Sequence, residues 1–333
     1  MRVLAAVLVA TLAACAADEG PEMWPAGLGT PDNPLPEDDL TYVVASRIDF
    51  TGGGAMPAPV TDAVASMRAF SQNPAKTLLG LADQTQVQQL KSAIGTTLTN
   101  SLEGWMNTEI DKARIASKTL RQYATDVVTI TETSLTNFYL DSALSMTPAK
   151  TTHTLIDLNF RPITVDVVVP MGGFVADKMT QNPTLAVAEG GAMILGDEKF
   201  GIAFGDHAWA GINTASTTLY GSGIQTAITT GINCSTLAKN VAAKCSGTSC
   251  VGHESQLRAI CDGGGAALYG QLRERVVALK LDTIRFTAGT ARLVDDHADG
   301  IADRIDMGTW QLEMDMGVGL QKLTATFMAT AQR

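Results

Sequence analysis

The sequence predicts an α+β fold in which an antiparallel sheet or open barrel is covered by amphipathic helices, with a disulfide-stapled helical hairpin attached. Two patterns predict this fold: strand-like segments come in runs, and helical segments form separate blocks between them. Four cysteines within residues 234–261 predict the hairpin. Since 45% of the 333 residues are hydrophobic, we expect one globular domain over residues 40–333.

The first elements are a strand and then a helical block. Residues 40–50 are rich in β-branched and aromatic side chains, and Thr51-Gly-Gly-Gly54 ends this strand. From Thr61 to Tyr123 the pattern is helical, with Asp62 as a cap and Pro74 at the start of a second helix. The clearest apolar stripe comprises Val87, Leu90, Ile94, Leu98, Leu102, Trp105 and Met106. We interpret it as a face buried on the sheet rather than a membrane-binding or partner-binding face.

The rest of the chain alternates between strand and helix signals. Alternating apolar residues are typical of antiparallel strands with one buried face. Strands are predicted at 127–131, 154–160 and 163–169, between 192 and 212, and at 283–293, 305–316 and 320–330. A helical segment separates these two groups at residues 223–279.

The N-terminus has the pattern of an export signal. Arg2 precedes an apolar run from Val3 to Leu12, which is too short to span a bilayer. The sequence Leu12-Ala13-Ala14-Cys15 follows and resembles the lipobox of bacterial lipoproteins. The resemblance implies a signal peptide at 1–14, a lipid on Cys15, and, because Ala16 rather than Asp follows, delivery to the outer membrane of a Gram-negative envelope. The alternative is ordinary cleavage nearby, with Cys15 left as a thiol.

Residues 15–39 form an acidic segment rich in Pro and Gly, with Trp24 as its one large apolar side chain. We predict that it is a tether between the lipid and the globular domain. The formal net charge of −10 argues against a nucleic-acid partner and against adhesion to anionic lipids by charge alone. The expected membrane contact is therefore the N-terminal lipid.

The remaining cysteines form an even set, which in an exported chain predicts disulfides. Ten residues separate Cys234 from Cys245, and ten separate Cys250 from Cys261. This symmetry favours a helical hairpin in which Cys234 pairs with Cys261 and Cys245 with Cys250, although the sequence permits three pairings. A zinc site is the alternative, but its two close cysteine pairs are not both present.

An acidic loop runs from Asp295 to Asp306. It resembles the calcium loop of EF-hand and dockerin proteins, and the resemblance implies a weak calcium site. The ligands would be the side chains of Asp295, Asp299, Asp303 and Asp306 and the carbonyl of Ile301, with Gly300 at the turn. His297 departs from the pattern at the third position, and Asp306 replaces the longer Glu at the last. The alternative is an acidic turn that Asp and Gly favour for local reasons.

The sequence contains none of the common catalytic motifs, neither a Gly-x-Ser-x-Gly elbow nor a His-Glu-x-x-His helix, and no Walker loop. Gly263-Gly-Gly265 is interpreted as a helix break. The leading hypothesis is a non-enzymatic envelope lipoprotein that binds an apolar ligand or a surface partner. The alternatives are a divergent secreted hydrolase, in which His207 or His253 would join a carboxylate in a cleft, and a calcium-stabilised structural or adhesion module.

Overall fold

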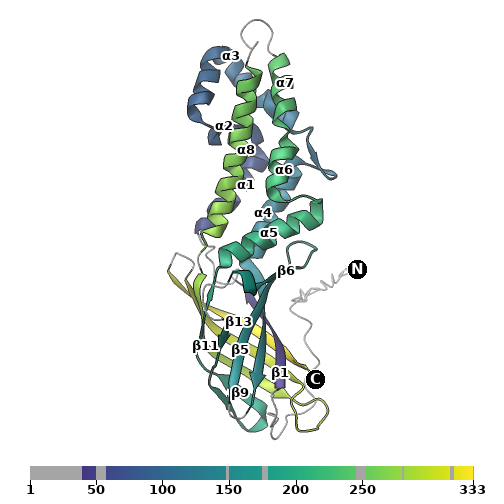
Figure 1. The fold of residues 1–333 in the computed structure, drawn as a ribbon, viewed down its shortest axis with the longest axis vertical. Coiled ribbons are helices and arrows are strands. Elements are labelled where there is room, and N and C mark those ends of the chain that lie inside the picture. The colour runs from purple at the N-terminus through teal and green to yellow at the C-terminus, as the bar shows by residue number, and fades with distance from the viewer. Residues whose placement is uncertain are drawn as a thin grey trace, which may run out of the picture.

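The computed structural model shows an α+β protein with its helices gathered at one end and its sheet at the other (Figure 1). It describes residues 40–49, 58–147, 150–174, 179–244, 253–279, 281–315 and 319–332. The predicted signal peptide, the tether, Cys15, Cys245 and Cys250 lie outside these residues. None of the helices in the described part of the chain is both long and apolar enough to cross a membrane.

Within the described residues, eleven strands form one antiparallel sheet. They are β1 (Leu40–Asp49), β4 (Asn137–Met146), β5 (Thr151–Phe160), β6 (Val167–Pro170), β7 (Thr180–Gln181), β8 (Leu185–Val187), β9 (Ala192–Leu195), β10 (Glu198–Ile202), β11 (Leu281–Val294), β12 (Arg304–Asp315) and β13 (Leu320–Gln332). The order is β6-β5-β4-β1-β13-β12-β11-β9-β8, with β7 on β5 and β10 on β11. A separate hairpin joins β2 (Arg114–Ile115) to β3 (Lys118–Thr119).

The sheet curves into an open barrel. β5 and β10 lie far apart along the strand order, yet His153 of β5 hydrogen-bonds Glu198 of β10. Inward-facing positions alternate with outward-facing ones along β1, β4 and β12, as the period of a strand requires. The inner positions carry large buried side chains, among them Tyr42, Phe200, Phe286 and Trp310. The interior of the barrel is therefore filled by side chains.

The helices pack mainly on one another and meet the sheet through α4 and α5. They are α1 (Ala58–Gln72), α2 (Pro74–Leu81), α3 (Gln84–Ile110), α4 (Leu120–Thr136), α5 (Phe204–Tyr220), α6 (Ile224–Ile232), α7 (Cys234–Lys244) and α8 (Glu254–Val277), with short 3-10 turns η2 (Met171–Gly173) and η3 (Glu189–Gly191). Pro74 begins α2 as predicted, and the Asn73 side chain caps it. Asp62 lies inside α1 instead of capping it.

The apolar stripe of α3 is core, as predicted, but its partners are helices. Val87, Leu90 and Met106 are fully buried, and α3 packs on α2, α7 and α8. The interpretation that this face lies on the sheet was therefore wrong. An apolar stripe indicates that a helix face is buried, and it does not specify whether the covering element is a helix or a strand.

Two predicted strands are helical. Residues 127–131 lie in α4, and residues 204–212 lie in α5. A capping box formed by Thr119 and Gln122 begins α4, and the buried positions that follow recur at helical spacing. β-branched residues fit this helix because it is buried against its neighbours, which overrides their preference for strands.

The triple glycine does not break α8, which continues from Glu254 to Val277. Gly264 instead allows α8 to approach α2 closely, since a Cβ there would lie 2.4 Å from the carbonyl oxygen of Leu78. Gly263 faces open space, with nothing within 4 Å of such a Cβ. The expectation of a helix break was wrong because close helix packing offsets the low helix propensity of glycine.

The strand registers define two ends of the sheet. β1 begins at Leu40 beside Met146 and ends at Asp49 beside Asn137, where α4 passes into β4. In the C-terminal strand β13, Gln332 is the register partner of Thr41 of β1. The start of β1 and the end of β13 thus lie at the end of the sheet away from the helices, as the ribbon shows (Figure 1).

Candidate functional site

A chain of three polar side chains crosses the inside of the barrel. The Oγ of Ser142 lies 2.8 Å from Nε2 of His153, and Nδ1 of His153 lies 2.8 Å from Oε2 of Glu198. The residues come from β4, β5 and β10. All three are buried, with 0%, 1% and 3% of their surface exposed. The hydrogen bonds therefore join two strands, β5 and β10, that share no backbone ladder.

Aromatic rings hold the imidazole in place. The ring of Trp310 stacks on His153 with centroids 5.7 Å apart and planes 9° apart. Phe200 and Phe286 contact His153 by their edges. Trp310 in turn donates from Nε1 to Oγ of Ser46 at 3.1 Å. These rings exclude water, so each hydrogen bond in the chain is costly to lose.

The order serine, histidine and carboxylate is that of a nucleophile, a base and an orienting acid. Two features oppose catalysis in this conformation. Ser142 is completely buried, and it lies inside β4, paired with Val44 on one side and Leu155 on the other. The arrangement links β4, β5 and β10 through side-chain hydrogen bonds.

His153 directly precedes the predicted strand at 154–160, and local sequence gives it no partner. Its position on the inner face of β5 could have been read from the alternation of that strand. Ser142 lies in a strand that was not predicted, and the contact with Glu198 depends on how the sheet curves. The pairing therefore could not be obtained from local sequence.

The two histidines proposed for a hydrolase have other surroundings. His207 is buried in α5 with Nδ1 3.1 Å from the carbonyl oxygen of Ala203, and burial lowers its pKa. Its ring lies 4.5 Å from that of Phe174. His253 occupies the N-cap position of α8, with Nδ1 3.2 Å from Oε1 of Gln256. In the described part of the chain, the hydrogen-bond partners of these two histidines are thus amide oxygens and not carboxylates.

The acidic loop connects β11 to β12 at the end of the sheet away from the helices. The carboxylate of Asp295 accepts hydrogen bonds from the backbone amides of His297, Asp299 and Gly300, at 3.1, 3.3 and 2.7 Å. The carboxylate of Asp303 accepts from the amide of Asp296 at 2.7 Å. These are the contacts of an aspartate-stabilised turn.

Arg304 supplies a positive charge beside this loop. Its guanidinium donates to Asp296 at 2.8 Å and to Asp306 at 2.5 Å. These two carboxylates raise the pKa of Arg304, whose side chain is 8% exposed. Among the described residues, no group of three or more His, Cys, Asp or Glu side chains is placed to hold a metal ion. The calcium site therefore stays a prediction, and the four aspartates proposed as its ligands already have protein partners.

The outer disulfide of the hairpin is confirmed. Cys234 at the start of α7 is bonded to Cys261 in α8, with their Cα atoms 5.6 Å apart. This bond joins the two helices at the base of the segment between them, as the symmetric spacing favoured. The predicted inner pair, Cys245 and Cys250, falls outside the described residues.

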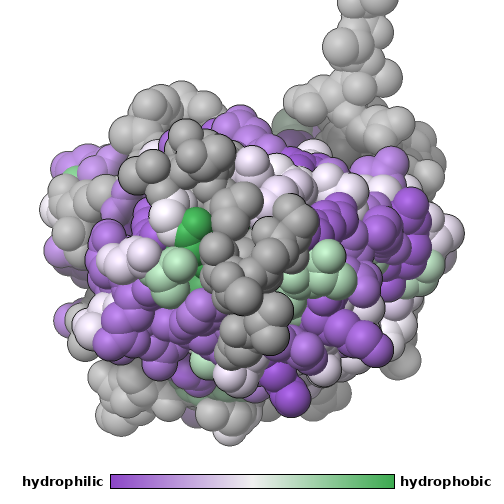
Figure 2. Space-filling model, turned by 90° about the horizontal axis from the view of Figure 1, so that it is seen from above, coloured by the Kyte–Doolittle hydropathy of each residue, from purple (hydrophilic) through white to green (hydrophobic). Residues whose placement is uncertain are grey.

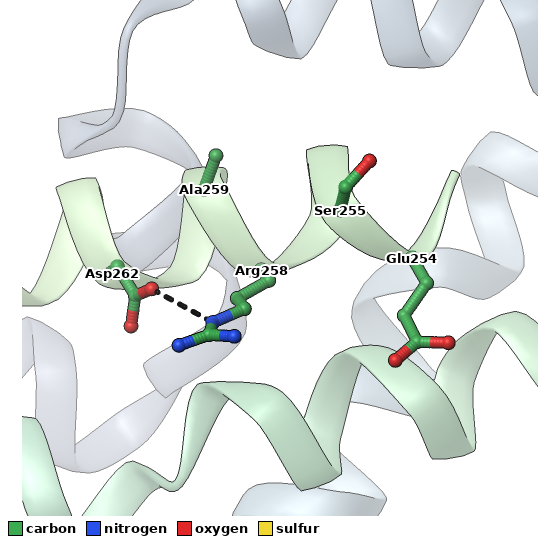
Figure 3. A pocket seen from close by; sticks show the side chains of 5 residues that line it. All are labelled: Glu254, Ser255, Arg258, Ala259 and Asp262. Carbon is green, nitrogen blue, oxygen red and sulfur yellow. Dashed lines mark ion pairs between the residues drawn. The ribbon is translucent and has the colours of Figure 1, made fainter. Parts of the chain in front are cut away.

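Charged residues line two surface depressions. One lies on the first turns of α8, where Glu254, Arg258 and Asp262 point to one side and Ser255 and Ala259 to the other (Figure 3). Arg258 and Asp262 form an ion pair at 3.5 Å. The other lies on the outer face of the sheet and is lined by Asp197, Lys199, Arg285, Glu313, Asp315 and Leu320. Neither has the apolar lining expected of a lipid-binding cleft.

The helical end of the molecule is mainly hydrophilic, with small hydrophobic areas between the polar residues (Figure 2). Comparison with protein-family models, curated protein sequences and solved structures finds no match to this chain.

Proposed function

We propose that the protein is a lipid-anchored lipoprotein of the bacterial envelope whose helical end binds another envelope component without catalysing a reaction. One observation carries the proposal: the chain enters the sheet at Leu40, at the end away from the helices. A lipid on Cys15 and a tether over residues 16–39 would then place the sheet next to the membrane. The helical end would point away from it.

The filled barrel supports a surface partner over an apolar ligand. Trp310, Phe286 and Phe200 occupy the interior, so an acyl chain would have to displace packed aromatic rings. The depression on α8 is lined by two carboxylates and a guanidinium, which favours polar contacts with a partner protein or glycan. The complete burial of Ser142 supports binding rather than catalysis.

Two measurements test the anchor and the orientation. Labelled fatty acid should enter the wild type and not Cys15→Ala, and labelling of the variant would reject Cys15 as the lipid site. For orientation, a fluorescent non-natural amino acid is placed at exposed Ser255 of α8 or at exposed Thr330 of β13. Quencher-bearing lipids should quench the Thr330 label more strongly. Equal quenching, or stronger quenching at Ser255, would contradict the orientation.

The polar chain of Ser142, His153 and Glu198 supports a hydrolase as the second candidate. A fluorophosphonate reacts with an activated serine and so tests this alternative directly. We expect no labelling of the folded wild type because Ser142 is buried. Labelling that disappears in Ser142→Ala but remains in Ser46→Ala would favour the hydrolase and oppose the binding function.

A further inference from the structure

Two carboxyl groups oppose each other on the outer face of the barrel. Asp141 of β4 is the register partner of Asp157 of β5, so that the two carboxyl groups lie on neighbouring strands of the same face. Such a pair can form a hydrogen bond when one of the two carboxyl groups holds a proton. Like charges directly opposite each other on paired strands would instead destabilise the pairing.

The pair lies at an irregularity of the β4–β5 ladder. The register shifts between Asp141 and Ser142, so that Ile156 of β5 is the extra residue and its side chain is 42% exposed. A bulge of this kind bends the strand and interrupts the ladder locally. The pair of Asp141 and Asp157 therefore lies where the backbone ladder between the two strands is interrupted.

The surroundings of the pair move the pKa of Asp141 toward neutral pH. Burial is the first cause that raises the pKa of Asp141 to about 7, followed by the hydrogen bond and the charge of Asp157. Arg161, whose guanidinium lies 4.3 Å from the ring centroid of Tyr139, opposes this rise.

Arg161 and Arg47, which flank the pair on this face, each have another acidic partner. Arg161 also pairs with Asp166 at 3.4 Å. On β1, Arg47 pairs with Asp49 at 3.5 Å, and Ala45 is the residue opposite Asp141. The cations on this face therefore only partly neutralise two ionised carboxylates.

The residue next to Asp141 reaches the inside of the barrel. Ser142 faces inward and contacts His153, which contacts Glu198. Ser142 and its register partner Leu155 form the first pair after the register shift, so a looser ladder at this point would move Ser142 away from β5, which carries His153. The outer carboxyl pair and the inner polar chain are thus mechanically connected through the backbone of β4.

We propose that the β4–β5 bulge is a proton-dependent hinge, in which Asp141 and Asp157 hold the two strands together while they share one proton and loosen them when both are ionised. The loosened ladder weakens the contact of Ser142 with His153 and so the closure between β5 and β10. The exchanged species is a proton taken from or given to solvent. The inference does not depend on the lipid anchor or on a partner.

Hydrogen exchange measured by mass spectrometry on the full chain tests the hinge. Peptides from residues 137–146 and 151–160 are compared at pH 6 and pH 8, with times corrected for the intrinsic pH dependence of exchange. The wild type should exchange roughly tenfold faster in these peptides at pH 8, as expected for one pH unit beyond the transition. In Asp141→Asn the corrected rates should not change with pH.

Asp166→Asn is the matched control, because Asp166 also pairs with Arg161 but is 67% exposed and lies off the bulge. It should behave as the wild type. Asp157→Asn gives a second way to remove the charge repulsion if Asp141→Asn does not fold. A wild type whose corrected rates are the same at both pH values would overturn the proposal, and so would the same pH-dependent increase in the folded Asn variants.

Discussion

Removing the bond between Cys234 and Cys261 should destabilise the helical end of the protein. The bond closes a segment with a sequence separation of 27 residues. Loop-entropy reasoning gives a loss of about 3.5 kcal/mol in the free energy of unfolding for a segment of this length. Both sulfur atoms belong to buried residues, so the double variant Cys234→Ala/Cys261→Ala should also lose some packing between α7 and α8.

Denaturant unfolding followed by circular dichroism without reductant measures this loss. Cys245→Ala/Cys250→Ala is the matched control, because it removes two cysteines and leaves the long segment closed. A loss below about 1 kcal/mol in the first variant would refute the loop-entropy reasoning. Peptide mapping without reduction that joined Cys234 to Cys245 would refute the hairpin itself.

Three further predictions use single substitutions. Gly264→Ala should lower the free energy of unfolding by about 1–3 kcal/mol because its Cβ would overlap the backbone of α2. Gly263→Ala should raise it by up to about 1 kcal/mol through helix propensity. Thermal or denaturant unfolding that ranked the two variants in reverse would contradict the packing. If the acidic loop binds calcium, millimolar calcium should raise the melting temperature of the wild type and not that of Asp299→Ala. Asp296→Ala should keep this rise, but its stability without calcium should be lower because it removes a partner of Arg304. No rise in the wild type means that the loop is a turn only. Because folding raises the pKa of Asp141 to about 7, the unfolding free energy of the wild type should fall as pH rises from about 4 to 7. The fall should be at most about 4 kcal/mol, and solvent screening reduces it. Asp141→Asn should flatten this slope, and an unchanged slope would contradict the assignment.

Local sequence was sufficient for elements whose signals agree with one another. Leu40 to Asp49 was predicted as a strand because alternation and composition point the same way. Pro74 marked the start of α2 because its fixed φ suits a first helical turn. The equal cysteine spacing favoured the bond between Cys234 and Cys261 because a hairpin places equidistant positions opposite each other.

Tertiary contacts determined the features for which the local signals conflict or are silent. The β-branched residues at 127–131 are helical because α4 is capped at Thr119 and buried among helices. The glycines of α8 continue a helix because α2 packs against Gly264.

The sequence by itself determined the class of the fold, the strands β1, β5, β11, β12 and β13, a preference for the pairing of Cys234 with Cys261, and the lipobox pattern at Cys15. Only the tertiary structure decided that His153 contacts Ser142 and Glu198 and that Asp141 faces Asp157. The physical reason is range: periodicity and caps act within a few residues, whereas these side chains meet only after the sheet has curved and its register has been set.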